Sequence, residues 1–235
     1  MPPLSNPGNE FDTYHTSYSD AVNKSIAFSG LDVDFFTRAK AVRLVDWLRE
    51  NIGNPKELSV LDVGCGVGNY HPLLVGDIGK LAGVDPSAEC IEVATSRNLG
   101  VTYKSFDGRR IPFGDNTFDA AFAICVMHHV PPPQWNEFST ELARVVRPGG
   151  AVLIYEHNPY NPLTQRVVSN CPFDKNAVLL KKRQIESFML DAGLSQVCGR
   201  YILAIPSISG MLRRVDDAFG VLPLGAQYYV AATKA

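Results

Sequence analysis

The chain has 235 residues, 46% hydrophobic and 20% charged, a composition that suits one domain with a sizeable core and excludes a disordered chain. Its formal net charge is -2, and its Lys and Arg residues are spread along the chain, which argues against a nucleic-acid partner. The 5 cysteines form no CxxC pair, so we expect neither a disulfide framework nor a zinc cluster.

The chain also lacks signals for export or membrane insertion. It starts without the basic and apolar segments of a secretion signal. None of its apolar runs approaches the roughly 18 residues that span a bilayer. We therefore expect a cytoplasmic protein with no membrane partner, while the sequence leaves the oligomeric state open.

Helix and strand patterns alternate along most of the chain. Residues 1–38 are expected to form a lid or helical segment, and residues 36–51 have the spacing of an amphipathic helix. Beyond them, short apolar runs that predict strands alternate with segments that predict helices. The predicted strands are 58–63, 81–84, 101–105, 118–127 and 151–155, and the predicted helices are 69–75, 88–97 and 134–146.

This alternation is typical of a parallel, doubly wound sheet with helices on both faces. Residues 158–180 have no strong period and are expected to form an irregular loop. The later predicted elements are helices at 182–192 and 207–219 and strands at 199–205 and 227–233. We therefore expect an α/β fold with a doubly wound seven-stranded sheet, mostly parallel, that ends in an antiparallel C-terminal edge strand.

A glycine-rich loop follows the first predicted strand. Gly64, Gly66 and Gly68 permit backbone angles that other residues resist and let a ligand approach the main chain. A nicotinamide-binding loop requires G-x-G-x-x-G, and here the third glycine comes one residue early; the Gly-Lys-Ser/Thr of a phosphate-binding P-loop is absent. Asp85 ends the next predicted strand, where a carboxylate can accept both hydroxyls of a ribose. The sequence therefore predicts a nucleoside ligand with an anionic tail and disfavours a nicotinamide-dependent oxidoreductase.

Several runs together resemble the class I S-adenosylmethionine-dependent methyltransferases, of the small-molecule, type 11-like kind. The resemblance covers about residues 40–157, and the order and spacing of the runs make it specific. The runs are LDVGCGVG at 61–68, GVDPS at 83–87, FDG at 106–108, IPF at 111–113 followed by FD at 118–119, MHHV at 127–130 and LARVVRPGG at 142–150.

The resemblance implies S-adenosylmethionine as cofactor and a role for individual residues. Asp62 and the loop hold the methionyl part, Asp85 takes the ribose hydroxyls, and Asp107 accepts from the adenine amino group. Phe106 packs beside the adenine ring. The implied cofactor-binding residues are Asp62, Gly64, Gly66, Gly68, Asp85, Pro86, Phe106, Asp107, Ile124 and, in the N-terminal lid, Tyr18.

The chemistry of this cofactor needs a placed nucleophile and no metal, because the methyl group of a sulfonium is already activated. A hydroxyl acceptor also needs a base, for which histidine is the usual choice. His157 follows the fifth predicted strand and is the first candidate, with His129 the second. We expect His71 to be a surface residue. Residues 158–180 are the expected acceptor-binding insertion.

The function predicted from the sequence is methyl transfer to a small-molecule acceptor, by O-methylation and without a metal. The alternatives are an RNA or protein methyltransferase and a non-catalytic S-adenosylmethionine-binding protein. The chain divides into a lid at 1–38, a cofactor-binding core at 39–157, and an acceptor-binding insertion with the end of the sheet at 158–235. These parts are expected to form a single domain.

Overall fold

The computed structural model describes residues 23, 24, 26 and 30–235. Most of the predicted lid, including Tyr18, lies outside the described residues. The helices are α3 Val33–Asn51, α4 His71–Leu74, α5 Ala88–Arg97, α6 Trp135–Val145, α7 Pro162–Asn170, α8 Lys182–Asp191 and α9 Gly210–Ala218. The strands are β1 Ser59–Val63, β2 Lys80–Asp85, β3 Thr102–Ser105, β4 Phe118–Ile124, β5 Val146–His157, β6 Leu194–Ile202 and β7 Gln227–Lys234. Short 3-10 helices are η2 Pro55–Glu57, η3 Met127–His129, η4 Pro132–Gln134 and η5 Pro172–Asp174.

In the described part of the chain, seven strands form one sheet in the order β3-β2-β1-β4-β5-β7-β6. The pairs among β1 to β5 are parallel, and β7 runs antiparallel to both β5 and β6. The predicted fold class and its antiparallel ending are therefore confirmed. The antiparallel strand β7 is inserted between β5 and β6, so β6 forms the edge of the sheet.

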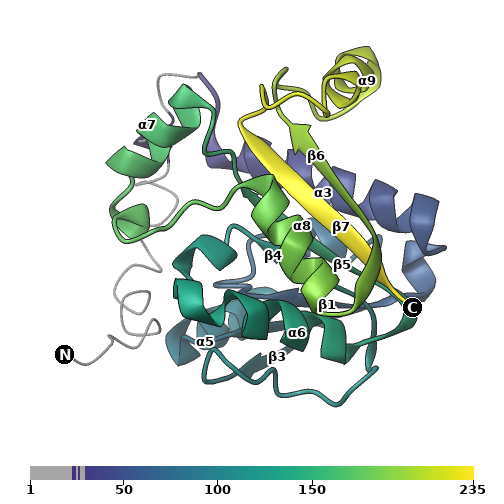
Figure 1. Ribbon diagram of the computed structural model, residues 1–235. Coiled ribbons are helices and arrows are strands. Elements are labelled where there is room, and N and C mark those ends of the chain that lie inside the picture. The colour runs from purple at the N-terminus through teal and green to yellow at the C-terminus, as the bar shows by residue number, and fades with distance from the viewer. Residues whose placement is uncertain (1–22, 25, 27–29) are drawn as a thin grey trace.

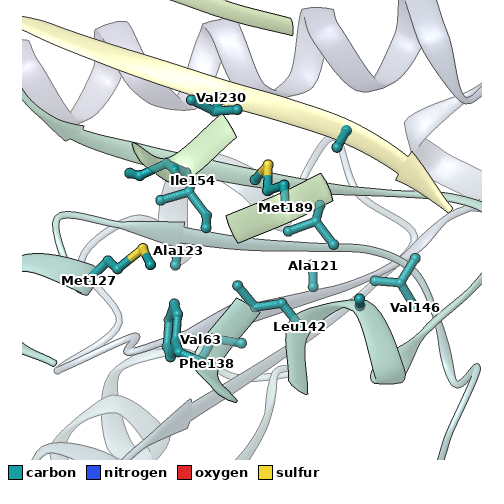
Figure 2. Packing of buried hydrophobic residues seen from close by; sticks show 14 of the residues in the cluster. Val63, Ala121, Ala123, Met127, Phe138, Leu142, Val146, Ile154, Met189 and Val230 are labelled. Atoms are coloured by element: carbon teal, nitrogen blue, oxygen red, sulfur yellow. The ribbon is translucent and has the colours of Figure 1, made fainter. Parts of the chain in front are cut away.

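Helices cover both faces of this sheet (Figure 1). Strand β4 requires cover on both faces, because its side chains alternate between the two faces and almost all of them are apolar and buried. Ala121 and Ala123 pack with α6 and α8 on one face, while Ala120 and Phe122 pack with α3 on the other. Figure 2 shows the first of these clusters, in which side chains of α6, α8, η3 and the strands pack together: Val63, Ala121, Ala123, Met127, Phe138, Leu142, Val146, Ile154, Met189 and Val230.

The insertion at 158–180 is more regular than predicted, because it contains α7. Asn161 caps this helix by accepting hydrogen bonds from the backbone N–H groups of Leu163 and Thr164, and Pro162 occupies its first turn. These are ordinary signals for the start of a helix, and the prediction of an irregular loop was wrong for this segment. No helix in the described residues is long and apolar enough to cross a bilayer.

A buried ion pair fixes α9 to α3. The guanidinium of Arg43 lies 2.6 Å from the carboxylate of Asp216, and both side chains are almost fully buried. Asp216 also accepts hydrogen bonds of 2.9 Å from the backbone N–H groups of Leu203 and Ile205. Both carboxylate oxygens are therefore hydrogen-bonded, and Asp216 holds the chain after β6 against the helix that precedes the sheet.

Candidate functional site

A large cavity opens beyond the carboxyl ends of β1, β2, β4 and β5, where ligands of open α/β sheets bind. Its volume is about 640 Å³. That lies within the roughly 300–1,000 Å³ of small-molecule and cofactor sites. The loops that follow these strands supply most of its polar residues, so the sheet topology decides which side chains meet there.

The loop after β1 brings its backbone to the cavity. Gly64 and Gly66 have φ angles of 79° and 51°, in the left-handed region that favours glycine. A Cβ on Gly64 would lie 2.5 Å from a methyl group of Val126, so close packing also requires glycine there. A Cβ on Gly66 would meet nothing within 4 Å. Gly66 therefore leaves open space beside a backbone that lines the cavity.

Asp85 ties the end of β2 to this loop. One carboxylate oxygen accepts the Gly66 N–H at 2.8 Å, and the other accepts the Ser87 N–H at 2.9 Å. The residue is 8% exposed and lines the cavity together with Pro86. Because a carboxylate offers about four lone-pair directions, both oxygens can still accept hydroxyl groups of a ligand.

Asp62, at the end of β1, lies beside a histidine that the sequence analysis misplaced. His71 is fully buried rather than on the surface, and its Nε2 lies 3.1 Å from the Asp62 carboxylate. Its Nδ1 bonds the hydroxyl of Tyr103. Burial raises the pKa of Asp62, and the His71 contact works against that shift. His71 thus fixes the orientation of a carboxylate that lines the cavity.

The far end of the cavity lies after β3. Phe106 and Asp107 line it, and Ile124 at the end of β4 lines the same cavity. The Asp107 carboxylate accepts the backbone N–H groups of Arg109 and Arg110, each at 2.9 Å, and these bonds lower its pKa. A carboxylate held in this way is an anionic acceptor in a cavity that an aromatic and an apolar residue also line.

Two adjacent histidines follow β4. His128 Nδ1 lies 2.5 Å from a carboxylate oxygen of Glu156, and both side chains are buried. Burial lowers the pKa of His128, but Glu156 and Asp174 outweigh it and raise the pKa to about 10. Burial and the neighbouring His128 lower the pKa of His129 to about 3. The two rings therefore differ in charge although they are adjacent in the sequence.

His157 ends β5 and completes the set of cavity histidines. Its ring centroid lies 5.3 Å from that of His128. Its Nδ1 lies 3.4 Å from the side-chain amide nitrogen of Gln227, the residue that pairs with it on β7. Both predicted base candidates, His157 and His129, therefore line the same cavity as the glycine loop and Asp85.

Comparison with known proteins identifies the family. Residues 60–150 match the family model described as a methyltransferase domain. The chain is 34% identical to methyltransferase GfsG of Streptomyces halstedii over 188 residues, which are 77% of this chain and 66% of that protein. The structure superposes on an S-adenosylmethionine-dependent methyltransferase of Thermotoga maritima with a TM-score of 0.68 and 21% identity, covering 97% of this chain and 100% of the other. The chain belongs to the class I S-adenosylmethionine-dependent methyltransferases.

Relatives within this methyltransferase family differ in the molecules for which they are named. A relative named tRNA methyltransferase 9B, of Bos taurus, is 38% identical over 97 residues, which are 41% of this chain and 20% of that protein. The chain spans between a fifth and about two thirds of the length of these two curated relatives. These matches show the methyltransferase family and not the acceptor, which has to be argued from the cavity.

The cavity residues fit S-adenosylmethionine, the cofactor of this family. The open space at Gly66 would admit a ligand against the backbone, while Asp62, Asp85 and Asp107 place carboxylates around the cavity. The predicted cofactor residues that line the cavity are Asp62, Gly64, Gly66, Asp85, Pro86, Phe106, Asp107 and Ile124. Gly68 is absent from this lining, and Tyr18 lies outside the described residues.

The methyltransferase cavity also contains residues that the sequence analysis missed. Lys40 of α3 is buried, and its Nζ lies 3.7 Å from Cys125 Sγ. Burial opposes ionisation of Cys125, but Lys40 and His157 outweigh it and lower its pKa to about 7. Cys125 lies within the apolar run at 118–127 that predicted a strand, and in the structure it directly follows β4. Asp174 and Gln227 come from the insertion and the last strand, where no local pattern marked them.

Proposed function

We propose that this chain transfers the methyl group of S-adenosylmethionine to a hydroxyl oxygen of a small-molecule acceptor. The observation that carries the proposal is that His157 lines the same cavity as the glycine loop and Asp85. A base and a cofactor site in one cavity satisfy the two needs of O-methylation, which are an in-line approach and removal of the hydroxyl proton.

The chain's own residues would hold the cofactor at three points. S-adenosylmethionine supplies an electrophilic methyl group on its sulfonium when bound. Asp62 would accept hydrogen bonds from its ammonium group, Asp85 from the ribose hydroxyls, and Asp107 from the adenine amino group. Each of these carboxylates is already oriented by other groups, which lowers the cost of ordering it around a ligand.

His157 is the preferred base, because its neighbours can fix its tautomer. The Gln227 side-chain oxygen is buried and has no hydrogen-bond partner among the described residues, while the amide nitrogen lies 3.4 Å from His157 Nδ1. Turning this amide about its last bond exchanges its oxygen and nitrogen. The oxygen would then accept Nδ1–H, which leaves Nε2 to take the acceptor's proton. His129 is the weaker candidate, because an imidazole with a pKa of about 3 is a weak base.

The acceptor is expected to have an apolar frame. Leu163 of α7 and Leu224, in the loop before β7, line the cavity and remain 56% and 55% exposed. Phe173 and Val167 of the insertion also line it. Apolar side chains that stay exposed at a cavity favour a ligand that buries them. A hydroxylated molecule with an apolar body fits this lining.

A second candidate function is methylation of tRNA, which the similarity to tRNA methyltransferase 9B favours. The net charge of -2 works against it, because RNA binding depends on neutralising phosphates. A third possibility, cofactor binding without catalysis, predicts no transfer to any acceptor.

The test is a transfer assay with methyl-labelled cofactor and two acceptor sets, apolar molecules that carry hydroxyl groups and total tRNA. We expect label in the hydroxyl compounds and none in the tRNA. His157→Gln should lower kcat by about 10²–10⁴-fold, the typical contribution of a general base, while calorimetry shows unchanged cofactor affinity. Label in the tRNA alone, or a His157→Gln enzyme as active as the unmodified one, would contradict the proposal.

A further inference from the structure

Three potential metal ligands converge in one wall of the cavity. They are His128 and His129 of η3 and Asp174 of η5, whose ligand atoms all lie within 4.8 Å of one another. Asp174 Oδ1 lies 3.4 Å from His128 Nε2 and 3.5 Å from His129 Nε2. These elements are far apart in the sequence, so the fold itself brings two imidazoles and a carboxylate together.

One of these ligand atoms is buried and lacks a hydrogen bond of normal geometry to the described residues. The side chain of His128 is 1% exposed, and within the described part of the chain its Nε2 has no such partner. Its 3.4 Å separation from the Asp174 carboxylate is an ion-pair distance, longer than the 2.7–2.9 Å usual for a charge-assisted hydrogen bond. Buried polar atoms are rarely left in this condition. The atom therefore points to an occupant that the side chains alone do not supply.

The two spacings that involve Asp174 match ligands that share one metal ion. Zinc is bound by imidazole and carboxylate at about 2.0–2.2 Å, so two ligands at a tetrahedral angle lie about 3.4 Å apart. The two nitrogen-to-oxygen separations in the structure, 3.4 and 3.5 Å, agree with that value. Two histidines and a carboxylate also suit the borderline divalent ions of the first transition row.

The other side of His128 has the partner that a metal-binding histidine usually has. Its Nδ1 lies 2.5 Å from Glu156 Oε2, and Glu156 Oε1 accepts the His128 backbone N–H at 3.3 Å. A carboxylate on the distal nitrogen fixes the tautomer and directs the lone pair of Nε2 toward the metal. Glu156 therefore orients His128 for coordination.

We propose that His128, His129 and Asp174 bind one divalent transition-metal ion, such as Zn²⁺, with Glu156 as the supporting carboxylate. Three protein ligands leave at least one coordination position for water or another oxygen ligand. Because all three ligands line the cavity, that position lies beside the acceptor space. The ion would also tie η5 of the insertion to the loop after β4. This differs from the metal-free chemistry expected from the sequence, and it does not depend on the proposed methyl transfer.

The competing account is a proton in place of the metal. His128 would then be an imidazolium between Glu156 and Asp174, and the cluster would be an ion-pair network that holds the insertion in place. Titration with metal distinguishes a metal site from an ion-pair network, because a metal site binds an added ion in a fixed stoichiometry and releases protons as it does so.

The experiment uses the full chain, stripped with a chelator and dialysed, and titrated by calorimetry with Zn²⁺ and, separately, followed by absorption with Co²⁺. We expect stoichiometric uptake of both ions and a Co²⁺ spectrum of low coordination number. Asp174→Asn and His129→Gln should abolish this uptake. Glu156→Gln should weaken it by about 10–100-fold, the usual effect of losing a supporting partner.

Two controls belong with these variants. His157→Gln removes a histidine from the same cavity but not from the cluster, and Cys198→Ser removes an exposed thiol, so both should bind metal as the unmodified chain does. A thermal shift with S-adenosylmethionine checks that each variant is folded. Absence of stoichiometric uptake by the unmodified chain, or equal uptake by folded Asp174→Asn and His129→Gln variants, would overturn the proposal.

Discussion

The two glycines at the cavity should respond differently to the same substitution. Alanine at either position must adopt a positive φ, which costs roughly 1–2 kcal/mol. At Gly66 nothing else is displaced, because no atom lies within 4 Å of the added Cβ. At Gly64 the Cβ would lie 2.5 Å from a Val126 methyl, and such overpacking costs roughly 1–3 kcal/mol more. Gly64→Ala should therefore be the less stable variant.

These costs convert into measurable shifts, since 1 kcal/mol moves the Tm of a chain of this size by roughly 2–4 °C. Gly66→Ala should lower the Tm by about 2–8 °C, and Gly64→Ala by about 4–20 °C. Gly66→Ala should nevertheless bind S-adenosylmethionine much more weakly, because its methyl group enters the space that we assign to the ligand.

The assay combines thermal unfolding with calorimetry of cofactor binding. A Val126→Ala substitution serves as the matched control, since it removes the methyl groups that Gly64→Ala would clash with and should relieve part of that variant's loss. It should give no relief to Gly66→Ala. Equal Tm losses at the two glycines, or unchanged cofactor affinity in Gly66→Ala, would refute the reasoning.

Three further predictions concern stability and the cofactor. Asp216→Asn should destabilise the fold by about 3–5 kcal/mol in chemical unfolding, because it removes the buried carboxylate partner of Arg43 and leaves the guanidinium with the half-exposed Asp217, at 3.5 Å, as its carboxylate partner; a loss under 1 kcal/mol would mean that the pair is not buried in solution. Arg144 lowers the pKa of Glu141 below its ordinary 4.5, so the stabilisation is present above that value and is lost as the pH falls through the folded pKa. The stability difference between the unmodified chain and Glu141→Gln should thus narrow below about pH 4.5 in unfolding curves, and a constant difference would contradict this. Asp107→Ala should weaken S-adenosylmethionine binding by about 10–150-fold, because one charged hydrogen bond is lost. Unchanged affinity would mean that Asp107 does not contact the cofactor.

Much of the fold followed from local patterns. The apolar runs before Gly64 and at Asp85 predicted β1 and β2, because strands buried on both faces read as continuous apolar segments. The helix α7 was missed although Asn161 and Pro162 mark its start, since its apolar face is short and its period weak. Strand β5 begins at Val146 rather than near 151, because the chain continues in the sheet through a bulge instead of ending in a turn.

The cofactor end of the site was more predictable than the acceptor end. Asp62 lies near the end of its predicted strand, and Asp85 and Asp107 come just after theirs, so the topology alone brings them to one edge of the sheet. His71 was misjudged, because its burial depends on Asp62 and Tyr103, which no local pattern connects to it. Asp174 and Gln227 line the cavity although they lie far along the chain from the glycine loop. Such long-range contacts are determined by tertiary packing and not by sequence spacing.

The account depends most directly on a nucleoside sulfonium bound by the Asp85 carboxylate. Calorimetric titration of S-adenosylmethionine into the unmodified chain, into Asp85→Ala and into the exposed-site control Asp77→Ala measures this in one series. We predict saturable binding by the unmodified chain and the control, and its near-complete loss in Asp85→Ala. Equal heats in all three proteins, or none in any of them, would contradict the account.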